Sequence, residues 1–296
     1  MQNHSGEKDQ GPGTLYVVST PIGNLEEFTF RAVNVLKNVD LIAAEGVRHT
    51  RGLCRHYGID TRLTRYDQHN GETKGPQLIR KLESGADIAL VTNAGSPGVS
   101  DPGVMLVSQA HEKKIRVSPI SGPSAVTAAL SVSGMRGDGF IFAGFLPNRT
   151  GKRKKALEGF AAAGNTLVFF EAPHRLRGMM ADLLEVLGDR PMVLMRELTK
   201  LYEEVLPGSV STILEALEGR QVKGEITLVV AGLDRTRAKD GKTVSEEIVH
   251  RLRTLLGDKS GSTRDIAHKV SEEEGLPYRS VYRACLSLKN EKIQRR

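Results

Sequence analysis

The segment Leu15–Leu25 reads LYVVSTPIGNL and decides the fold class of this chain. Its apolar run, Leu15–Ser19, is typical of a buried strand, and the Thr-Pro-Ile-Gly-Asn stretch that follows is typical of a tight turn. A helical pattern with apolar residues at Phe30, Val33 and Leu36 comes next. Strand, loop and helix in this order predict a βα unit of an α/β fold.

The same alternation continues along the chain and predicts ten strands. Those of the first set are Leu15–Ser19, Leu41–Ala44, Arg62–Tyr66, Ile88–Thr92 and Ile115–Pro119; those of the second are Phe140–Gly144, Thr166–Phe170, Pro191–Arg196, Tyr202–Leu206 and Glu225–Ala231. We therefore expect two α/β domains of about five strands each, residues 14–122 and 123–234, with mainly parallel sheets. The boundary is placed where Gly, Ser and Pro accumulate, in Ser121–Asp138.

The two ends of the chain differ in character from this body. Residues 1–13 are polar and are predicted to be a disordered lead-in without the apolar core of a secretory signal. Residues 243–290 are predicted to form a basic helical module similar to a helix-turn-helix, in which Ser262 or Thr263 caps one helix and Pro277 opens the next. Arg235–Lys242 is predicted to be a charged linker.

Positive charge is concentrated at two places. The formal net charge is +7, and residues 235–296 hold 15 Lys and Arg against 9 Asp and Glu, so this tail carries +6 of it. A second basic cluster lies in Arg149–Lys155. Such clusters attract polyanions through counterion release, which favours nucleic acid as a partner. The alternative is a solvated face that only keeps the protein soluble.

Several classes of site are not supported by any motif. No apolar run reaches about 18 residues, so we expect no membrane span. The two cysteines, Cys54 and Cys285, are far apart, and neither zinc-ligand spacing nor a phosphate-binding G-x-x-x-x-G-K-[ST] loop occurs. We expect no metal site, and a reducing, cytoplasmic location.

Loops rich in Gly, Pro and Ser follow three predicted strands: Thr20–Leu25, Asn93–Gly103 and Pro119–Ala125. In open α/β sheets, ligands bind beyond the carboxyl ends of the strands. We therefore expect the three loops to share one pocket. Charged residues follow other strands, at Glu45–Arg51, Phe170–Arg175 and Arg196–Glu204, where they form either part of a site or structural ion pairs.

Together these motifs resemble the tetrapyrrole-methylase superfamily, and within it the ribosomal RNA small-subunit methyltransferase branch. The residues that carry the resemblance are Thr20–Leu25, Ala94–Gly103, Gly122–Ala125 and Arg196–Lys200. The resemblance implies that S-adenosylmethionine lies in the cleft between two α/β domains. It also implies 2′-O-methylation of a cytidine in the decoding region of small-subunit (16S) rRNA, whether free or in the assembled small ribosomal subunit, and a homodimer.

The resemblance also assigns residues to roles. Cofactor-binding residues are Pro21, Ile22, Gly23, Gly95, Ser96, Pro97, Gly98, Val99, Ser124, Ala125, Phe170 and Glu171. Glu45 and Glu197 are predicted to handle the proton, with His49 and His69 as further candidate bases. The predicted substrate-binding residues are Arg48, His49, Arg196 and Lys200.

Two positions depart from the pattern of the family. Where relatives commonly read Glu-Asp-Thr-Arg, this chain has Glu45-Gly46-Val47-Arg48, and the loop after the fourth strand begins with Asn93 instead of Asp. Both changes remove negative charge near the expected site. Two other functions stay open at this point: a small-molecule tetrapyrrole-type methyltransferase, and an RNA-binding relative without activity.

Overall fold

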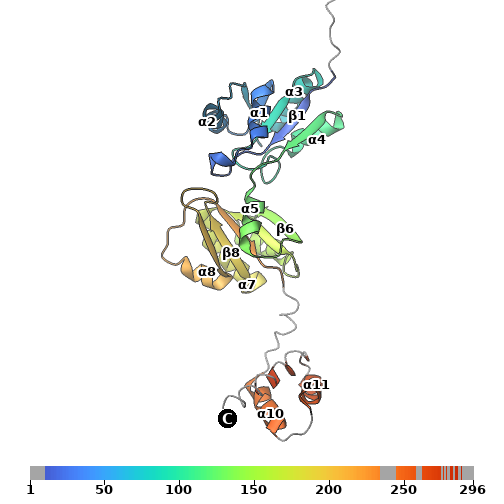
Figure 1. Cartoon of the computed structure of the whole chain (residues 1–296), viewed down its shortest axis with the longest axis vertical. Helices are drawn as coiled ribbons and strands as arrows, with labels where there is room; N and C mark the ends of the chain where they lie inside the picture. Colours follow the sequence, from blue (N-terminus) through green and yellow to red (C-terminus); the bar gives the residue numbers. More distant parts are fainter. Residues whose placement is uncertain are drawn as a thin grey trace, which may run out of the picture. The chain divides into compact units, whose positions relative to one another are not determined.

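The computed structural model describes residues 11–233, 245–257 and 262–274, with 276, 278, 281–282, 284–285 and 288 (Figure 1). The chain divides into two compact units. One contains residues up to 161 together with 165–231, and the other contains 162–164 and 232–296. Most of the predicted lead-in and the whole of the predicted linker lie outside the described residues. The boundary predicted between residues 122 and 123 stays a prediction.

The first sheet contains β1 (Thr14–Val18), β2 (Leu41–Ala44), β3 (Leu63–Arg65), β4 (Ile88–Val91) and β5 (Arg116–Ile120). All neighbours are parallel, in the order β3-β2-β4-β1-β5. The strands therefore share one carboxyl edge. Because β4, β1 and β5 are adjacent, the loops that follow them start side by side.

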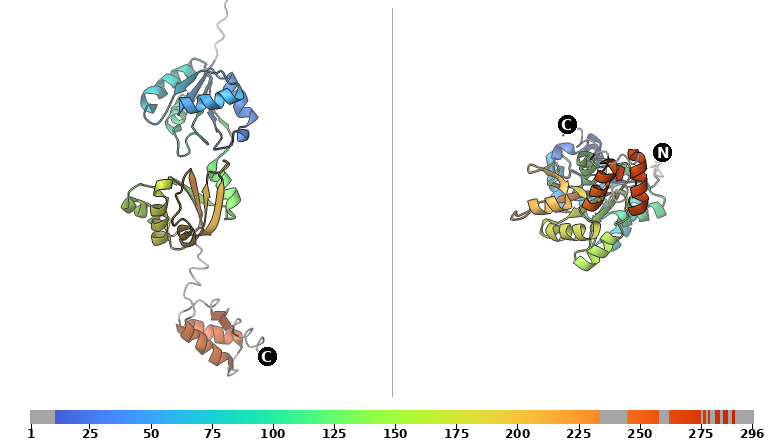
Figure 2. Two further views of the ribbon diagram at one scale, coloured as in Figure 1. Left: turned by 90° about the vertical axis from the view of Figure 1, so that its left-hand side faces the viewer. Right: turned by 90° about the horizontal axis from the view of Figure 1, so that it is seen from below.

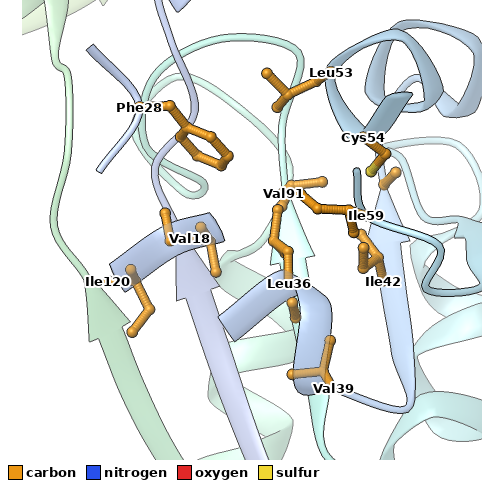
Figure 3. Packing of buried hydrophobic residues seen from close by; sticks show 13 residues of the cluster. Val18, Phe28, Leu36, Val39, Ile42, Leu53, Cys54, Ile59, Val91 and Ile120 are labelled. Atoms are coloured by element: carbon orange, nitrogen blue, oxygen red, sulfur yellow. The ribbon is translucent and has the colours of Figure 1, made fainter. Parts of the chain in front are cut away.

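Helices cover both faces of this sheet (Figures 1 and 2). The helices α1 (Phe30–Asn38) and α2 (Val47–Tyr57) pack on one face, and α3 (Gly71–Glu83) and α4 (Val104–Glu112) on the other. A 3-10 turn, η1 (Leu25–Glu27), precedes α1. Figure 3 shows the core under α1 and α2, where Leu36 meets strand residues such as Ile42 and Val91.

The sequence analysis missed helix α2. Its sequence, VRHTRGLCRHY, is dominated by charges, and only Thr50, Leu53 and Cys54 are buried. These three residues have the i, i+3, i+4 spacing of one helix face. The spacing of these three residues indicates a helix, although most of the other residues of α2 are charged or polar.

The second sheet contains β6 (Phe140–Phe145), β7 (Thr166–Glu171), β8 (Pro191–Arg196), β9 (Glu204–Ser209) and β10 (Ile226–Val230). Its order is β6-β7-β10-β8-β9, and only β6 and β7 pair in parallel. The prediction of mainly parallel sheets is therefore wrong here. The short connection between β8 and β9 forces antiparallel pairing, because a parallel pair needs a long crossover.

Helix α5 (Ala125–Ser133) packs on one face of the second sheet against β8 and β10. The helices α6 (Thr150–Glu158), α7 (Leu176–Leu187) and α8 (Val210–Ala216) pack together, and the turn η2 (Pro173–Arg175) leads into α7. In α6, Arg153 is 4% exposed and its Nε lies 2.6 Å from Asp182 Oδ2. One member of the basic cluster is thus a buried structural residue.

The second unit contains α10 (Glu246–Gly257) and α11 (Thr263–Glu274). Ser262 caps α11, since its Oγ accepts a hydrogen bond from the Asp265 amide at 3.3 Å while Asp265 Oδ2 accepts one from the Ser262 amide. The described residues between 278 and 288 are helical and share one apolar core with both helices. The predicted role of Pro277 lies outside the described residues. None of the helices within the described ranges combines the length and the apolar character that crossing a bilayer requires.

Candidate functional site

Hydrogen bonds join the loops at the carboxyl edge of the first sheet. Thr20 and Gly95 exchange both backbone hydrogen bonds, at 2.9 and 3.0 Å. The hydroxyls of Ser19 and Ser96 lie 2.8 Å apart. A Cβ on Gly122 would lie 3.0 Å from that of Ser19, so the loop after β5 passes close to the loop after β1. The three glycine-rich loops therefore form one fixed surface.

A pocket of about 380 Å³ opens at this surface and receives residues from both sheets. The volume falls in the usual range of small-molecule sites. The residues that line it are Ile22, Glu45, Asn93, Ala94, Gly95, Ser96, Val99, Ser100, Asp101, Ser124, Ala125, Val126, Phe145, Phe170, Glu171, Ala172, Pro173, Leu198, Gly224, Glu225, Ile226 and Thr227.

Many of the predicted site residues lie in this lining. They are Glu45, Ile22, Gly95, Ser96, Val99, Ser124, Ala125, Phe170 and Glu171. Of the predicted cofactor-binding residues, Pro21, Gly23, Pro97 and Gly98 lie outside it. Gly23 supports the pocket from behind: a Cβ there would lie 2.4 Å from Lys200 Cγ and 3.0 Å from the Leu198 carbonyl.

The sequence analysis missed one wall of the pocket, Gly224–Thr227 at the start of β10. The predicted pocket contains only residues that follow the carboxyl ends of strands. Strand β10 runs antiparallel to both of its neighbours, and Ile226 pairs with Glu171 of β7 and with Arg196 of β8. Its amino end therefore lies beside their carboxyl ends. The apolar pattern of β10 does not show in which direction the strand runs, so this wall was not predicted from the sequence.

Asp101 is a second missed residue, and its surroundings are acidic. Burial raises the pKa of its carboxyl from 3.8 to about 6, with further contributions from Glu45 and Glu225. Glu45 belongs to the end of β2, where its Oε2 accepts a hydrogen bond from the Asn93 amide at 3.0 Å. Asp101, Glu45 and Glu225 thus bring three carboxyl groups from two sheets to one cavity.

Glu171 is the most buried acid of the pocket. Its side chain is 0% exposed, and Oε1 lies 3.1 Å from Arg175 Nε and accepts a hydrogen bond from the Ala172 amide at 2.8 Å. Its Oε2 is buried and has no hydrogen-bond partner among the described residues. Burying a carboxylate oxygen without a hydrogen-bond partner costs free energy, so this atom is suited to accept a hydrogen bond from a ligand.

The loop after β8 has an unusual backbone. Glu197 and Thr199 take φ values of +52° and +65°, in the left-handed region. The loop is held by the Thr199 amide, which donates to Glu203 Oε2 at 2.6 Å, and by the Asn24 amide, which donates to Thr199 Oγ1 at 3.2 Å. This arrangement brings Leu198 into the pocket lining.

The predicted proton carrier Glu197 is occupied by other contacts. Its Oε1 accepts hydrogen bonds from Lys200 Nζ at 2.9 Å and from the Glu225 amide at 2.8 Å. The bond from Lys200 holds the pKa of the Glu197 carboxyl below its usual range. Lys200 also lies 3.0 Å from Glu225 Oε2. Within the described residues Glu197 does not line the pocket.

The predicted substrate-binding residues fall into two groups. Arg48 and His49 are exposed on the first turn of α2, which begins directly after Glu45. Arg196 lies 2.9 Å from Glu204, which Arg220 also contacts, so the guanidinium of Arg196 has a carboxylate partner, as Lys200 does. His69 is exposed on the segment before α3.

Two of the three residues that depart from the family pattern, Gly46 and Asn93, lie against each other, whereas the third, Val47, begins α2. A Cβ on Gly46 would lie 2.2 Å from Asn93 Oδ1, so the amide side chain occupies space that only glycine leaves open. Asn93 Oδ1 is buried and has no hydrogen-bond partner in the described part of the chain. The residue types at positions 46 and 93, beside Glu45, therefore depend on each other through steric contact.

Comparison with known proteins gives a consistent result. Residues 14–214 match the family described as Tetrapyrrole (Corrin/Porphyrin) Methylases. Among curated relatives named Ribosomal RNA small subunit methyltransferase I, that of Bacillus subtilis is 39% identical over 290 residues, covering 96% of this chain and 97% of the relative. That of Xylella fastidiosa is 43% identical over 275 residues, covering 92% and 98%.

Solved structures share the fold at lower identity. A uroporphyrin III C-methyl transferase from Thermus thermophilus aligns with a TM-score of 0.54 and 18% identity, covering 76% of this chain and 100% of the other. A diphthine synthase aligns with a TM-score of 0.56 and 15% identity, covering 74% and 90%. At these identities the likeness concerns the fold alone.

Proposed function

Because the chain belongs to the tetrapyrrole (corrin/porphyrin) methylase family, we propose that it is an S-adenosylmethionine-dependent methyltransferase of small-subunit rRNA. The observation that carries the proposal is the identity of about 40% over nearly the whole chain to relatives named Ribosomal RNA small subunit methyltransferase I. The finer part of the proposal is that the methyl group goes to the ribose 2′-oxygen of a cytidine in the decoding region. A homodimeric state belongs to the same proposal.

The pocket suits S-adenosylmethionine chemically. Apolar side chains such as Ile22, Phe170 and Leu198 offer a surface for a purine ring, and the serine hydroxyls of Ser96 and Ser124 offer hydrogen bonds. The unpartnered Oε2 of Glu171 accepts a hydrogen bond from an amino or hydroxyl group. When bound, the sulfonium centre supplies an electrophilic methyl group.

The chain's own residues must orient the ribose and take its proton. A 2′-hydroxyl is a poor nucleophile at neutral pH, so a base assists its attack on the methyl carbon. We assign proton acceptance to the pair Glu45 and Asp101, which face the same cavity. Glu197 is a weaker base because Lys200 stabilises its charged form. The two sheets hold the reactants in line, which contributes much of the rate.

We propose that the exposed Arg48 and His49 contact RNA next to the pocket, where an arginine can pair with phosphate. Arg196 and Lys200 have carboxylate partners, and their proposed contribution is to hold the loop after β8 in place. The basic tail, residues 235–296, supplies further contacts with the RNA backbone.

The decisive experiment is transfer of a labelled methyl group from S-adenosylmethionine to unmodified small subunits and to naked rRNA, followed by mapping of the product. We expect label on one cytidine ribose, and a large loss with Glu45→Gln but not with the exposed variant Asp60→Asn. Label on a base, or transfer only to a tetrapyrrole acceptor, would contradict the proposal.

A truncated chain tests the contribution of the tail. Deletion of residues 235–296 is expected to leave binding of S-adenosylmethionine intact and to abolish most methylation of RNA. Unchanged methylation by the truncated protein would show that the tail does not hold the substrate.

A further inference from the structure

The charge of the pocket is opposite to the charge of the chain. Its described lining contains the four acids Glu45, Asp101, Glu171 and Glu225 and no Lys, Arg or His, whereas the whole chain carries +7. Two of these acids are partly neutralised, because Glu171 pairs with Arg175 and Glu225 pairs with Lys200. Asp101 forms no ion pair with any described residue. The cavity therefore holds uncompensated negative charge.

Resting on the function proposed above, we propose that this pocket selects the methyl donor over the demethylated product by charge, with Asp101 as the main determinant. The donor, S-adenosylmethionine, has a positive sulfonium. When the ribose oxygen bonds to the methyl carbon, the carbon–sulfur bond breaks and its electron pair stays on sulfur. The hydroxyl proton passes to a carboxylate. The product, S-adenosylhomocysteine, is a neutral thioether and loses the attraction.

The position of Asp101 explains why it dominates. It lies in the turn closed by the hydrogen bond from the Gly98 amide to the Pro102 carbonyl, at 3.2 Å, which fixes its backbone. Asp101 is desolvated, and Glu45 and Glu225, which line the same pocket, add repulsion to its carboxylate. A cation placed among these groups relieves their mutual repulsion, and the relief is larger than in water because the site is partly buried.

The other acids of the pocket are expected to contribute less to the preference for the cationic donor. The side chain of Glu225 is 74% exposed and lies 3.0 Å from Lys200 Nζ, so solvent and a cation both screen it. Glu171 offers one free oxygen, Oε2, and its other oxygen faces Arg175. The raised pKa of Asp101 agrees with this ranking, since burial and then repulsion from Glu45 and Glu225 disfavour its charged form.

Calorimetric titration of the full chain at pH 7.5 tests the inference with three probes: S-adenosylmethionine, S-adenosylhomocysteine and sinefungin, which carries an amine-bearing carbon in place of the methylsulfonium. The variants are Asp101→Asn, Glu225→Gln and the control Asp60→Asn, which removes an exposed charge near the amino edge of the first sheet. The ratio of dissociation constants for product and donor is the readout.

We expect the wild type and Asp60→Asn to favour both cationic probes. Asp101→Asn is expected to lower the ratio about tenfold, through weaker binding of the cations and nearly unchanged binding of the product. Glu225→Gln is expected to lower it only about twofold. An equal loss for all three probes, or an unchanged ratio, would overturn the inference. Failure of the wild type to bind any probe would instead remove the proposed function on which it rests.

Discussion

Replacing Asp101 by Asn is expected to stabilise the ligand-free protein at pH 7.5. Burial, with Glu45 and Glu225, raises the pKa of the Asp101 carboxyl from 3.8 to about 6. At about 1.4 kcal/mol for each pKa unit, a rise of about two corresponds to roughly 3 kcal/mol of destabilisation by the charged form. Because solvent reaches part of the site and screens the repulsion, we expect a gain of about 1–2 kcal/mol.

The gain depends on pH in a defined direction. Between pH 3.8 and about 6 the folded protein binds more protons at Asp101 than the unfolded chain does, so this residue lowers stability as pH rises through that window. The destabilisation is complete above pH 6. The advantage of Asn over Asp is therefore largest at pH 7.5 and falls to about half at pH 5.

Thermal or urea unfolding without ligand measures this difference. For the unit that contains both sheets, about 1–2 kcal/mol corresponds to a rise of roughly 2–8 °C in Tm. Asp60→Asn, which removes an exposed charge, is the matched control and is expected to change stability by less than about 0.5 kcal/mol. An Asp101→Asn protein that is no more stable than wild type at pH 7.5, or equally stabilised at pH 5, would refute the reasoning.

Three further substitutions test the structure. Gly46→Ala is expected to destabilise the protein by about 1–2 kcal/mol, since its Cβ would lie 2.2 Å from Asn93 Oδ1. In a chain that also carries Asn93→Ala, the same substitution is expected to be nearly neutral. Additive effects on urea unfolding in this double-mutant cycle would exclude the contact. Gly23→Ala pushes on the loop after β8, so calorimetry is expected to show about tenfold weaker binding of S-adenosylmethionine, and unchanged affinity would count against this support. Asp182→Asn leaves the buried Arg153 without its carboxylate, for an expected loss of about 3–5 kcal/mol in urea unfolding; a loss below about 1 kcal/mol would contradict the pairing.

The wall of the pocket formed by the loops of the first sheet could be predicted from the sequence because that sheet is parallel throughout. Apolar runs identify its strands, and the loops after them carry Gly, Pro and Ser in recognisable order. In a parallel sheet, all carboxyl ends share one edge, so residues as distant as Ile22, Ser96 and Ser124 are brought together. Sequence order and spatial order agree here.

The other side could not be predicted because its geometry depends on strand direction and on local backbone conformation. The start of β10 enters the site only because β10 opposes its neighbours, which alternation of apolar residues does not encode. The left-handed conformation of Glu197 is equally invisible in the sequence. In this conformation Glu197 Oε1 accepts hydrogen bonds from Lys200 Nζ and from the Glu225 amide, so one oxygen of this candidate base is engaged by other residues.

Net charge illustrates the same limit, because the chain carries +7 while its pocket is lined by acids. A basic surface attracts the phosphate backbone of RNA whatever its base sequence. The same charge inside the pocket would repel a cationic methyl donor. The acids that line the pocket lie between Glu45 and Glu225 in the chain, so no window of sequence shows them as a cluster. Folding places them in one cavity, where by our proposal their charge disfavours phosphate and favours a sulfonium. On the function proposed above, this division would let one basic protein bind a polyanion outside and a cation inside, with the ribose hydroxyl as the group that reaches the pocket.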